Sequence, residues 1–254
     1  TNMLERVENR DKTVKIALVG KYTKLHDAYL SVVEALSHAG YENSAIIDIK
    51  WVDAETVNKD TVESLLKDCQ GILVPGGFGD RGIEGMVCAS NYARVNNIPY
   101  LGVCLGMQIA VIEYARNVLN MENANSTEFD LETKYPVIAL MPDQFGNIMG
   151  GTMRLGAYPC KVKEKTMLHK CYGDLNISER HRHRYEFNND FREQMIENGL
   201  TIAGTSPDGK LVEAVEVEKN KFHVGVQYHP EFKSRPNRAN PIFKGFINAA
   251  VSML

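Results

Sequence analysis

Apolar and polar positions alternate in two regular ways through the first half of the chain. Residues 14–20 form an apolar run typical of a buried strand. After Asp27, a candidate N-cap, Leu30, Val33 and Leu36 recur at helical spacing, which predicts a helix that ends at the following glycine. The same pattern predicts strands at 46–52, 71–74 and 98–103 and helices at 61–69, 83–96 and 105–118. Strands that alternate with helices indicate a parallel sheet covered on both faces.

The pattern changes after about residue 120, where short β-rich segments follow one another. These segments span residues 149–162, 179–188, 200–206, 211–217 and 222–227. Residues 241–254 predict a final amphipathic helix, whose apolar face carries Ile242, Phe243, Phe246, Ile247 and Val251. No repeat or linker divides the chain. We therefore expect one doubly wound, flavodoxin-like α/β domain over 14–254, mostly parallel, with an antiparallel elaboration in its second half.

Composition and charge narrow the function classes. The chain has 254 residues, 44% of them hydrophobic and 24% charged, as in an ordinary soluble globular protein. A net charge of −3 gives no reason to expect nucleic acid or a membrane as partner, and no apolar run approaches the ~18 residues that a membrane span needs. The cysteines, at 69, 88, 104, 160 and 171, form no C-x-x-C pair, and the N-terminus has no apolar signal segment. These features favour a reducing, cytoplasmic location.

Two glycine motifs imitate nucleotide-binding loops but fail on context. Residues 77–82 fit G-x-G-x-x-G, a fingerprint that belongs on the first strand–helix turn with an acidic residue about 20 positions further on. Here the motif follows the third predicted strand, and the next strand ends without a carboxylate. The Gly-Lys pair at 20–21 suggests a P-loop, yet Lys15 and Tyr22 stand where that loop requires glycine and serine or threonine. We therefore expect no dinucleotide or ATP cradle.

Residues 102–106 (GVCLG) are the strongest local signal for chemistry. They have the form of a nucleophile elbow, with Cys104 in place of the usual serine between two glycines. Such a residue sits on a sharp strand-to-helix turn, where the helix N-terminus favours a thiolate. A buried, inert thiol is the commoner fate of a free cysteine, and we assign it to the other four. The flanking glycines favour a nucleophile at Cys104.

His229 and Glu231 supply the base and orienting group that a thiol nucleophile needs. They follow the strand predicted at 222–227, and residues two apart in extended backbone point the same way. Alone, a His-Pro-Glu tripeptide such as residues 229–231 would more often be a surface turn. Together with the cysteine elbow, it predicts a Cys-His-Glu triad.

The glycine loop at 75–82 then has a different use. It leaves one parallel strand, and Cys104 leaves the next, so both should meet at the carboxyl edge of the sheet. Backbone N–H groups of this loop and of Leu105 could stabilise an oxyanion above the thiol.

With these motifs together, the chain resembles the class I (triad) glutamine amidotransferase family and, within it, the glutaminase domains of CTP synthases. The resemblance runs from about residue 14 to the C-terminus. Its selective segments are residues 101–108, 124–128, 150–156 and 179–186. It implies hydrolysis of L-glutamine to glutamate and ammonia through a γ-glutamyl thioester, with no metal or cofactor in this domain.

The resemblance also implies a role for each matching residue. Cys104 would be the nucleophile, His229 the acid and base, Glu231 its orienter, and Gly77 and Leu105 the oxyanion hole. The glutamine-binding residues would be Gly77, Phe78, Leu105, Gly106, Met107, Gln108, Glu128 and Arg184. A carboxylate and a guanidinium suit the α-ammonium and α-carboxylate of glutamine. Thr152 and Arg154 fall where the family senses GTP as an allosteric activator.

In that family an N-terminal synthetase domain of the same polypeptide uses the ammonia to aminate UTP to CTP, with ATP and Mg²⁺, in a homotetramer. We expect residues 1–13 to be the remnant of a linker to it. Two alternatives stay open: a stand-alone γ-glutamyl peptide hydrolase on this fold, and a non-catalytic binding module. A basic segment at 180–184 could also be a solvated strand or an RNA-binding patch, although its arginines and histidines alternate between two faces.

Overall fold

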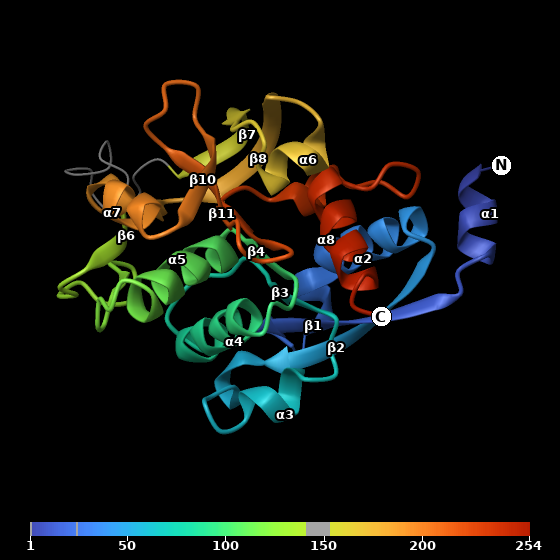
Figure 1. Ribbon diagram of the computed structural model, residues 1–254, viewed down its shortest axis with the longest axis horizontal. Helices are drawn as coiled ribbons and strands as arrows, with labels where there is room; N and C mark the ends of the chain where they lie inside the picture. The colour runs from blue at the N-terminus through green and yellow to red at the C-terminus, as the bar shows by residue number, and fades with distance from the viewer. Residues whose placement is uncertain (1, 24, 141–152) are drawn as a thin grey trace.

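The computed structural model describes residues 2–23, 25–140 and 153–254 (Figure 1). Within these residues, the main sheet has nine strands in the order β2-β1-β3-β4-β12-β11-β10-β7-β8. The first five are parallel: β2 (Ala45–Asp53), β1 (Lys12–Gly20), β3 (Gly71–Val74), β4 (Tyr100–Val103) and β12 (His223–Val226). The others are antiparallel: β11 (Val212–Val217), β10 (Leu200–Thr205), β7 (Arg154–Val162) and β8 (Asn176–His183). The predicted architecture, a mostly parallel sheet with an antiparallel extension, is confirmed.

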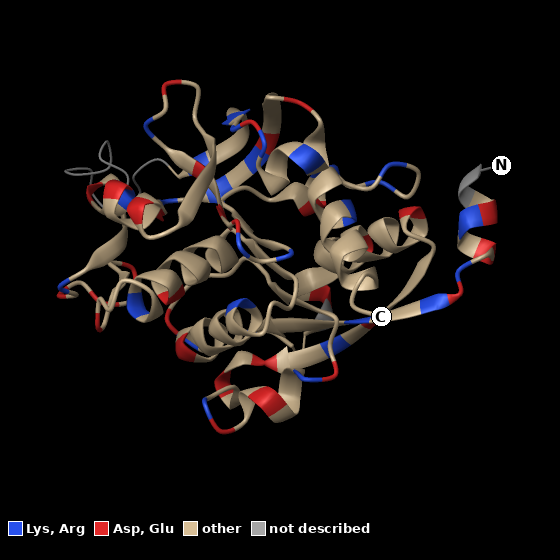
Figure 2. Cartoon of the chain, viewed as in Figure 1, with Lys and Arg blue, Asp and Glu red and all other residues tan. Residues whose placement is uncertain are grey.

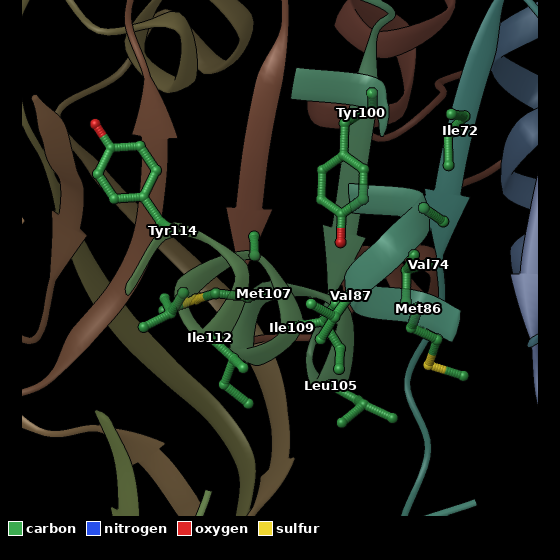
Figure 3. Packing of buried hydrophobic residues seen from close by; sticks show 14 of the residues in the cluster. Ile72, Val74, Met86, Val87, Tyr100, Leu105, Met107, Ile109, Ile112 and Tyr114 are labelled. Carbon is green, nitrogen blue, oxygen red and sulfur yellow. The ribbon is translucent and has the colours of Figure 1, made fainter. Parts of the chain in front are cut away.

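Helices cover both faces of the parallel strands (Figure 1). On one face lie α3 (Val62–Leu66), α4 (Ile83–Val95) and α5 (Leu105–Asn117); on the other lie α2 (Leu30–Glu42) and α8 (Pro241–Val251). A hydrophobic core lies on each face of the sheet, and successive strand residues point into them alternately. Ile72 and Val74 pack with α4 and α5 (Figure 3), whereas Leu73 packs with α2 and α8. Two-sided burial explains why these strands are continuous apolar runs.

Several elements were not predicted. Within the described residues, a separate three-stranded sheet joins β5 (Asn125–Ser126) and β6 (Pro136–Leu140) to β9 (Tyr185–Phe187), which was predicted only as part of the strand at 179–188. Short helices form at α1 (Asn2–Glu8), α6 (Met167–Tyr172) and α7 (Arg192–Glu197), with 3-10 turns at His26–Tyr29, Ala54–Thr56, Asn189–Phe191 and Pro230–Lys233. The segment expected to be a linker remnant thus contains a helix, and β1 begins at Lys12. Its role as a linker stays a prediction.

The first predicted helix is confirmed, but its start, cap and end were predicted wrongly. A 3-10 turn occupies His26–Tyr29, and α2 begins at Leu30 with no side-chain cap and continues past Gly40 to Glu42. Leu30 is exposed, whereas Val32 and Leu36 are buried. The buried Tyr29 hydroxyl accepts the Lys21 backbone N–H at 3.0 Å, and this tertiary contact, invisible to a periodicity argument, holds the turn against the sheet.

Candidate active site

Cys104 lies on a strained turn between β4 and α5. Its backbone has φ 53° and ψ −100°, a conformation that a non-glycine residue rarely adopts. The neighbouring glycines make the turn possible. A Cβ added at Gly102 would lie 2.4 Å from the Gly106 carbonyl, and one added at Gly106 would lie 2.1 Å from the Val74 carbonyl oxygen. The spacing of the predicted elbow therefore follows from close backbone packing.

The Cys104 sulfur faces one polar group that follows β12 and another that lies in β8. Gln227 Nε2 lies 3.7 Å from Sγ, and Sγ lies 3.9 Å from the Arg182 carbonyl oxygen. The Cys104 backbone N–H donates to the Val226 carbonyl at 2.7 Å, which ties the elbow to β12. The thiol thus sits at the carboxyl ends of β4 and β12, next to the N-terminus of α5.

His229 and Glu231 form the expected pair. His229 Nδ1 lies 2.7 Å from Glu231 Oε1, and both side chains are largely buried. Pro230 starts the 3-10 turn that presents Glu231, and the His229 N–H donates to the Arg180 carbonyl at 2.7 Å. Burial favours neutral imidazole, but the charge and hydrogen bond of Cys104, together with Glu231, outweigh it and raise the pKa of His229 to about 10.

The loop after β3 passes directly over these groups. A Cβ at Gly76 would lie 2.8 Å from His229 Cε1 and 3.6 Å from Cys104 Cβ, so only glycine permits this approach. Gly77 follows within the same pocket as Cys104. Gly79 and Gly82 have φ of +75° and +72°, and Gly82 is the N-cap residue of α4. These last two glycines shape the turn into α4, whereas the importance of Gly76 was missed.

A pocket of about 400 Å³ opens beside Cys104. Its lining residues are Gly77, Phe78, Cys104, Gln108, Glu128, Met153, Arg182, His183, Arg184 and Tyr185. Five of the predicted glutamine-binding residues are therefore brought together: Gly77, Phe78, Gln108, Glu128 and Arg184. Leu105, Gly106 and Met107 do not line it, and the Leu105 and Met107 side chains pack into the core (Figure 3). A larger hollow of about 730 Å³ between α6 and α8 contains none of the predicted site residues.

Polar contacts hold the pocket walls. Glu128 Oε1 accepts the Gly79 N–H at 3.0 Å, and Gln108 Nε2 donates to the Tyr185 carbonyl at 2.9 Å. The Arg182 guanidinium lies 5.7 Å from the Phe78 ring centroid. Arg182 was not assigned a role from the sequence. The alternation of arginines and histidines, which places Arg182 on the same exposed face as Arg184, could have indicated it.

The alternation along β8 is as predicted: its arginines are exposed, and His181 and His183 are buried. His181 Nδ1 lies 3.0 Å from His183 Nε2, and His181 Nε2 lies 3.6 Å from Glu213 Oε2. Burial, followed by the nearby Arg154 charge, lowers the pKa of His181 to about 2 and that of His183 to about 3. Both histidines are therefore uncharged at neutral pH. His183 lines the pocket and His181 lies behind it, and we call the two the neutral wall of the pocket.

Arg154 lies behind this wall. Its Nη1 is 2.6 Å from Glu213 Oε1, its guanidinium is 4.5 Å from the Tyr158 ring centroid, and the residue is 9% exposed. Burial raises the pKa of Glu213 to about 7, with Arg154 opposing the shift. Direct contact between Arg154 and a nucleotide would require this ion pair to open. Thr152 lies outside the described residues.

The described residues show neither a one-sided charge distribution nor a metal-ligand cluster. Figure 2 shows acidic and basic residues scattered among one another over the molecule. Within residues 2–23, 25–140 and 153–254, no three His, Cys, Asp or Glu side chains are grouped so that they could hold a metal ion. No helix in the same part of the chain is both long and apolar enough to cross a membrane.

Comparisons with known proteins identify the family of this chain. The family model of class I glutamine amidotransferases matches residues 24–249. CTP synthases of Clostridium kluyveri and Clostridium beijerinckii are 57% and 59% identical over 98% of this chain. The match covers 47% of either relative, so the chain spans about half their length.

Solved structures of glutamine amidotransferases are also similar to this chain. The glutaminase domain of Trypanosoma brucei CTPS, solved with bound acivicin, is 40% identical with a TM-score of 0.90, and the match covers 94% of either chain. A glutamine amidotransferase of Thermotoga maritima is 12% identical with a TM-score of 0.54, which indicates a shared fold only.

Proposed function

The chain belongs to the class I glutamine amidotransferase family, among the glutaminase domains of CTP synthases, and on that premise we propose how its residues hydrolyse the side-chain amide of L-glutamine. The observation that carries the proposal is the contact series Cys104–His229–Glu231 at the edge of a pocket. A nucleophile, a base and an orienting carboxylate in this order are the requirement for covalent amide hydrolysis.

The first half of the reaction forms a thioester. The Cys104 thiolate attacks the side-chain carbonyl carbon of glutamine, and the N–H groups of Gly77 and Leu105 stabilise the oxyanion. A pKa of about 10 keeps the His229 imidazole protonated at neutral pH beside the thiolate. As the tetrahedral intermediate collapses, His229 gives that proton to the departing nitrogen, which leaves as ammonia.

The second half regenerates the enzyme. Neutral His229 takes a proton from water, and the hydroxide attacks the γ-glutamyl thioester to release glutamate and the thiolate. Glu231 holds the imidazole in the required orientation throughout both halves.

Charges in the pocket suit free glutamine. Glu128 is a partner for the α-ammonium group, and Arg184 is a partner for the α-carboxylate. Phe78 and Gln108 line the space between them and the thiol. A γ-glutamyl peptide carries the same two α-groups, so competition in the labelling of Cys104 is what separates it from free glutamine.

We further propose that the ammonia serves the ATP- and Mg²⁺-dependent amination of UTP in an N-terminal synthetase domain. The support is that relatives named CTP synthase are about twice as long as this chain. A homotetramer, GTP activation through Thr152 and Arg154, and a cytoplasmic location belong to the same proposal. No catalytic step above depends on GTP.

Labelling Cys104 with a glutamine-analogue affinity reagent tests the substrate assignment. We expect intact-mass spectrometry to show one adduct, absent in Cys104→Ala, retained in the control Cys88→Ala, and suppressed by free glutamine. Labelling that glutamine does not suppress would contradict the assignment, and suppression by a γ-glutamyl peptide alone would favour the peptide hydrolase.

A further inference from the structure

Lys21 lies beside the glycine loop, at the carboxyl end of β1, where the sequence suggested only a failed P-loop. The residue is 4% exposed. Its Nζ donates to the Phe78 carbonyl at 2.9 Å and also to the Gly79 carbonyl. An added Cβ at Gly77 would lie 3.8 Å from Lys21 Cδ and Cε, so the aliphatic stem packs beside the expected oxyanion donor.

A buried ammonium is costly unless hydrogen bonds replace its hydration. Among the described residues, no carboxylate lies within 4 Å of Lys21 Nζ, so the loop carbonyls are its hydrogen-bond partners. Burial lowers the pKa of Lys21 to about 8, while Glu128 and Asp80 oppose the shift and Arg81 adds to it. The ammonium is thus directed at the backbone of the loop.

Two side chains hold the same peptide unit from opposite sides. The Phe78 carbonyl and the Gly79 N–H belong to one trans peptide and point in opposite directions. Lys21 binds the carbonyl, and Glu128 accepts the N–H at 3.0 Å. Lys21 is itself fixed, because its backbone N–H donates to the Tyr29 hydroxyl and its carbonyl accepts from Arg81 Nη2 at 2.5 Å.

We propose that Lys21 is a positioning residue that holds the loop so that the Gly77 N–H stays over Cys104 and Glu128 stays at the amino-acid end of the pocket. The proposal rests on the proposed glutaminase function and adds to it a residue outside the triad. Lys21 does not touch the reacting atoms. It acts through the peptide between Phe78 and Gly79.

The test separates loop positioning from folding and from thiol reactivity. Lys21→Met keeps the aliphatic stem and removes the donor. Losing one oxyanion donor costs about 10²–10³ in kcat, and we expect glutamate release to fall by about 10²-fold. Alkylation of Cys104 by iodoacetamide needs no oxyanion hole, so its rate should stay within about twofold of wild type, since the triad is untouched.

Rates are normalised to alkylatable Cys104, which counts correctly folded sites. Lys15→Met is the matched control, because Lys15 lies on β1, the strand that leads to Lys21, and pairs with Asp68 at the surface. It should leave both rates unchanged. If Lys21→Met is not recovered folded, Lys21→Gln, which keeps a neutral donor on a shorter chain, should show the same split with a smaller loss.

Three outcomes would overturn the proposal. Unimpaired glutamate release by folded Lys21→Met, with normal wild-type turnover, overturns the positioning role alone. A parallel fall in glutamate release and alkylation shows a general disturbance of the site and also overturns it. A wild-type chain that releases no glutamate overturns the proposed function, and the positioning role with it.

Discussion

His229 lies on one side of the pocket and the buried pair His181 and His183 on another, and their pKa values are shifted in opposite directions. The pKa of His229 is raised to about 10, whereas those of His181 and His183 are lowered to about 2 and 3. Burial acts in the same direction on all three, because it disfavours the charged imidazolium. The difference lies in the neighbouring charges.

His229 faces the Cys104 sulfur and the Glu231 carboxylate, which together outweigh burial. His181 and His183 instead lie near the Arg154 cation, which pairs closely with Glu213 and adds to the effect of burial. One group can therefore carry a proton in catalysis, and the other forms an uncharged wall. That wall leaves the recognition of charge in the pocket to Glu128 and Arg184.

The largest effect is expected from removing the anion that faces His229. Cys104→Ala should reduce glutamate production by roughly 10⁶-fold, because nucleophile and base act as a unit. It should also lower the pKa of His229, measured by NMR titration, because the sulfur raises it. The thermal melt should stay near wild type, and Cys88→Ala serves as the control. Retained glutamate production would show that another residue is the nucleophile.

Glu231→Gln should remove the second group that raises the pKa of His229. It keeps the shape of the side chain but removes the charge 2.7 Å from His229 Nδ1. We expect kcat to fall by roughly 10⁴-fold and the pKa of His229 to fall as well. Steady-state kinetics and NMR titration of the same sample check both. An unchanged His229 pKa would mean that the carboxylate does not govern this imidazole.

Arg154→Met should disturb the neutral wall. It leaves Glu213 buried without its partner, which should lower the free energy of unfolding by about 3–5 kcal/mol. Adding Glu213→Gln to Arg154→Met should recover part of this loss. As a control, Arg180→Met, at an exposed arginine, should change the free energy of unfolding little. In the single variant the pKa of His181 should rise, because the Arg154 charge that helps to lower it is gone. Urea denaturation and NMR titration test this, and an unshifted His181 would contradict the role given to Arg154.

The smallest effect is a dependence of stability on pH. In the folded chain, His181 binds a proton only near pH 2, whereas an unfolded histidine binds one near 6.5. Stability is therefore fully present above pH 6.5 and is lost as pH falls towards the folded pKa. Between pH 7 and pH 5, protonation of this histidine in the unfolded chain should lower the free energy of unfolding by about 2 kcal/mol. His181→Gln should flatten the pH dependence by that amount in denaturation curves, and an equally steep curve would contradict the lowered pKa.

The fold and site were predictable where local pattern and global structure agree. The parallel strands are buried on both faces, so their apolar runs marked them well, and β3 was predicted with its observed bounds. The predicted strand at 179–188 instead divides at Arg184, where the chain leaves β8 for β9 in another sheet. No local signal marks that switch, because the pairing partner, β6, lies far away in the sequence.

The residues missed at the site have a related explanation. Gly76 matters because His229 and Cys104 pack against its α-carbon, and Lys21 matters because two loop carbonyls lie at its ammonium. Both contacts join segments far apart along the chain. The sequence showed a glycine among glycines and a lysine after a strand, with nothing to connect them.

By itself, the sequence determined the alternation that builds the sheet, the glycine spacing around Cys104 and the pairing of His229 with Glu231. These depend on residues within a few positions of one another. Only the tertiary structure decided which histidine is charged, which loop glycine meets the imidazole, and that Lys21 holds the loop. Hydration and electrostatic energies depend on distance in space and on burial, which local periodicity does not contain.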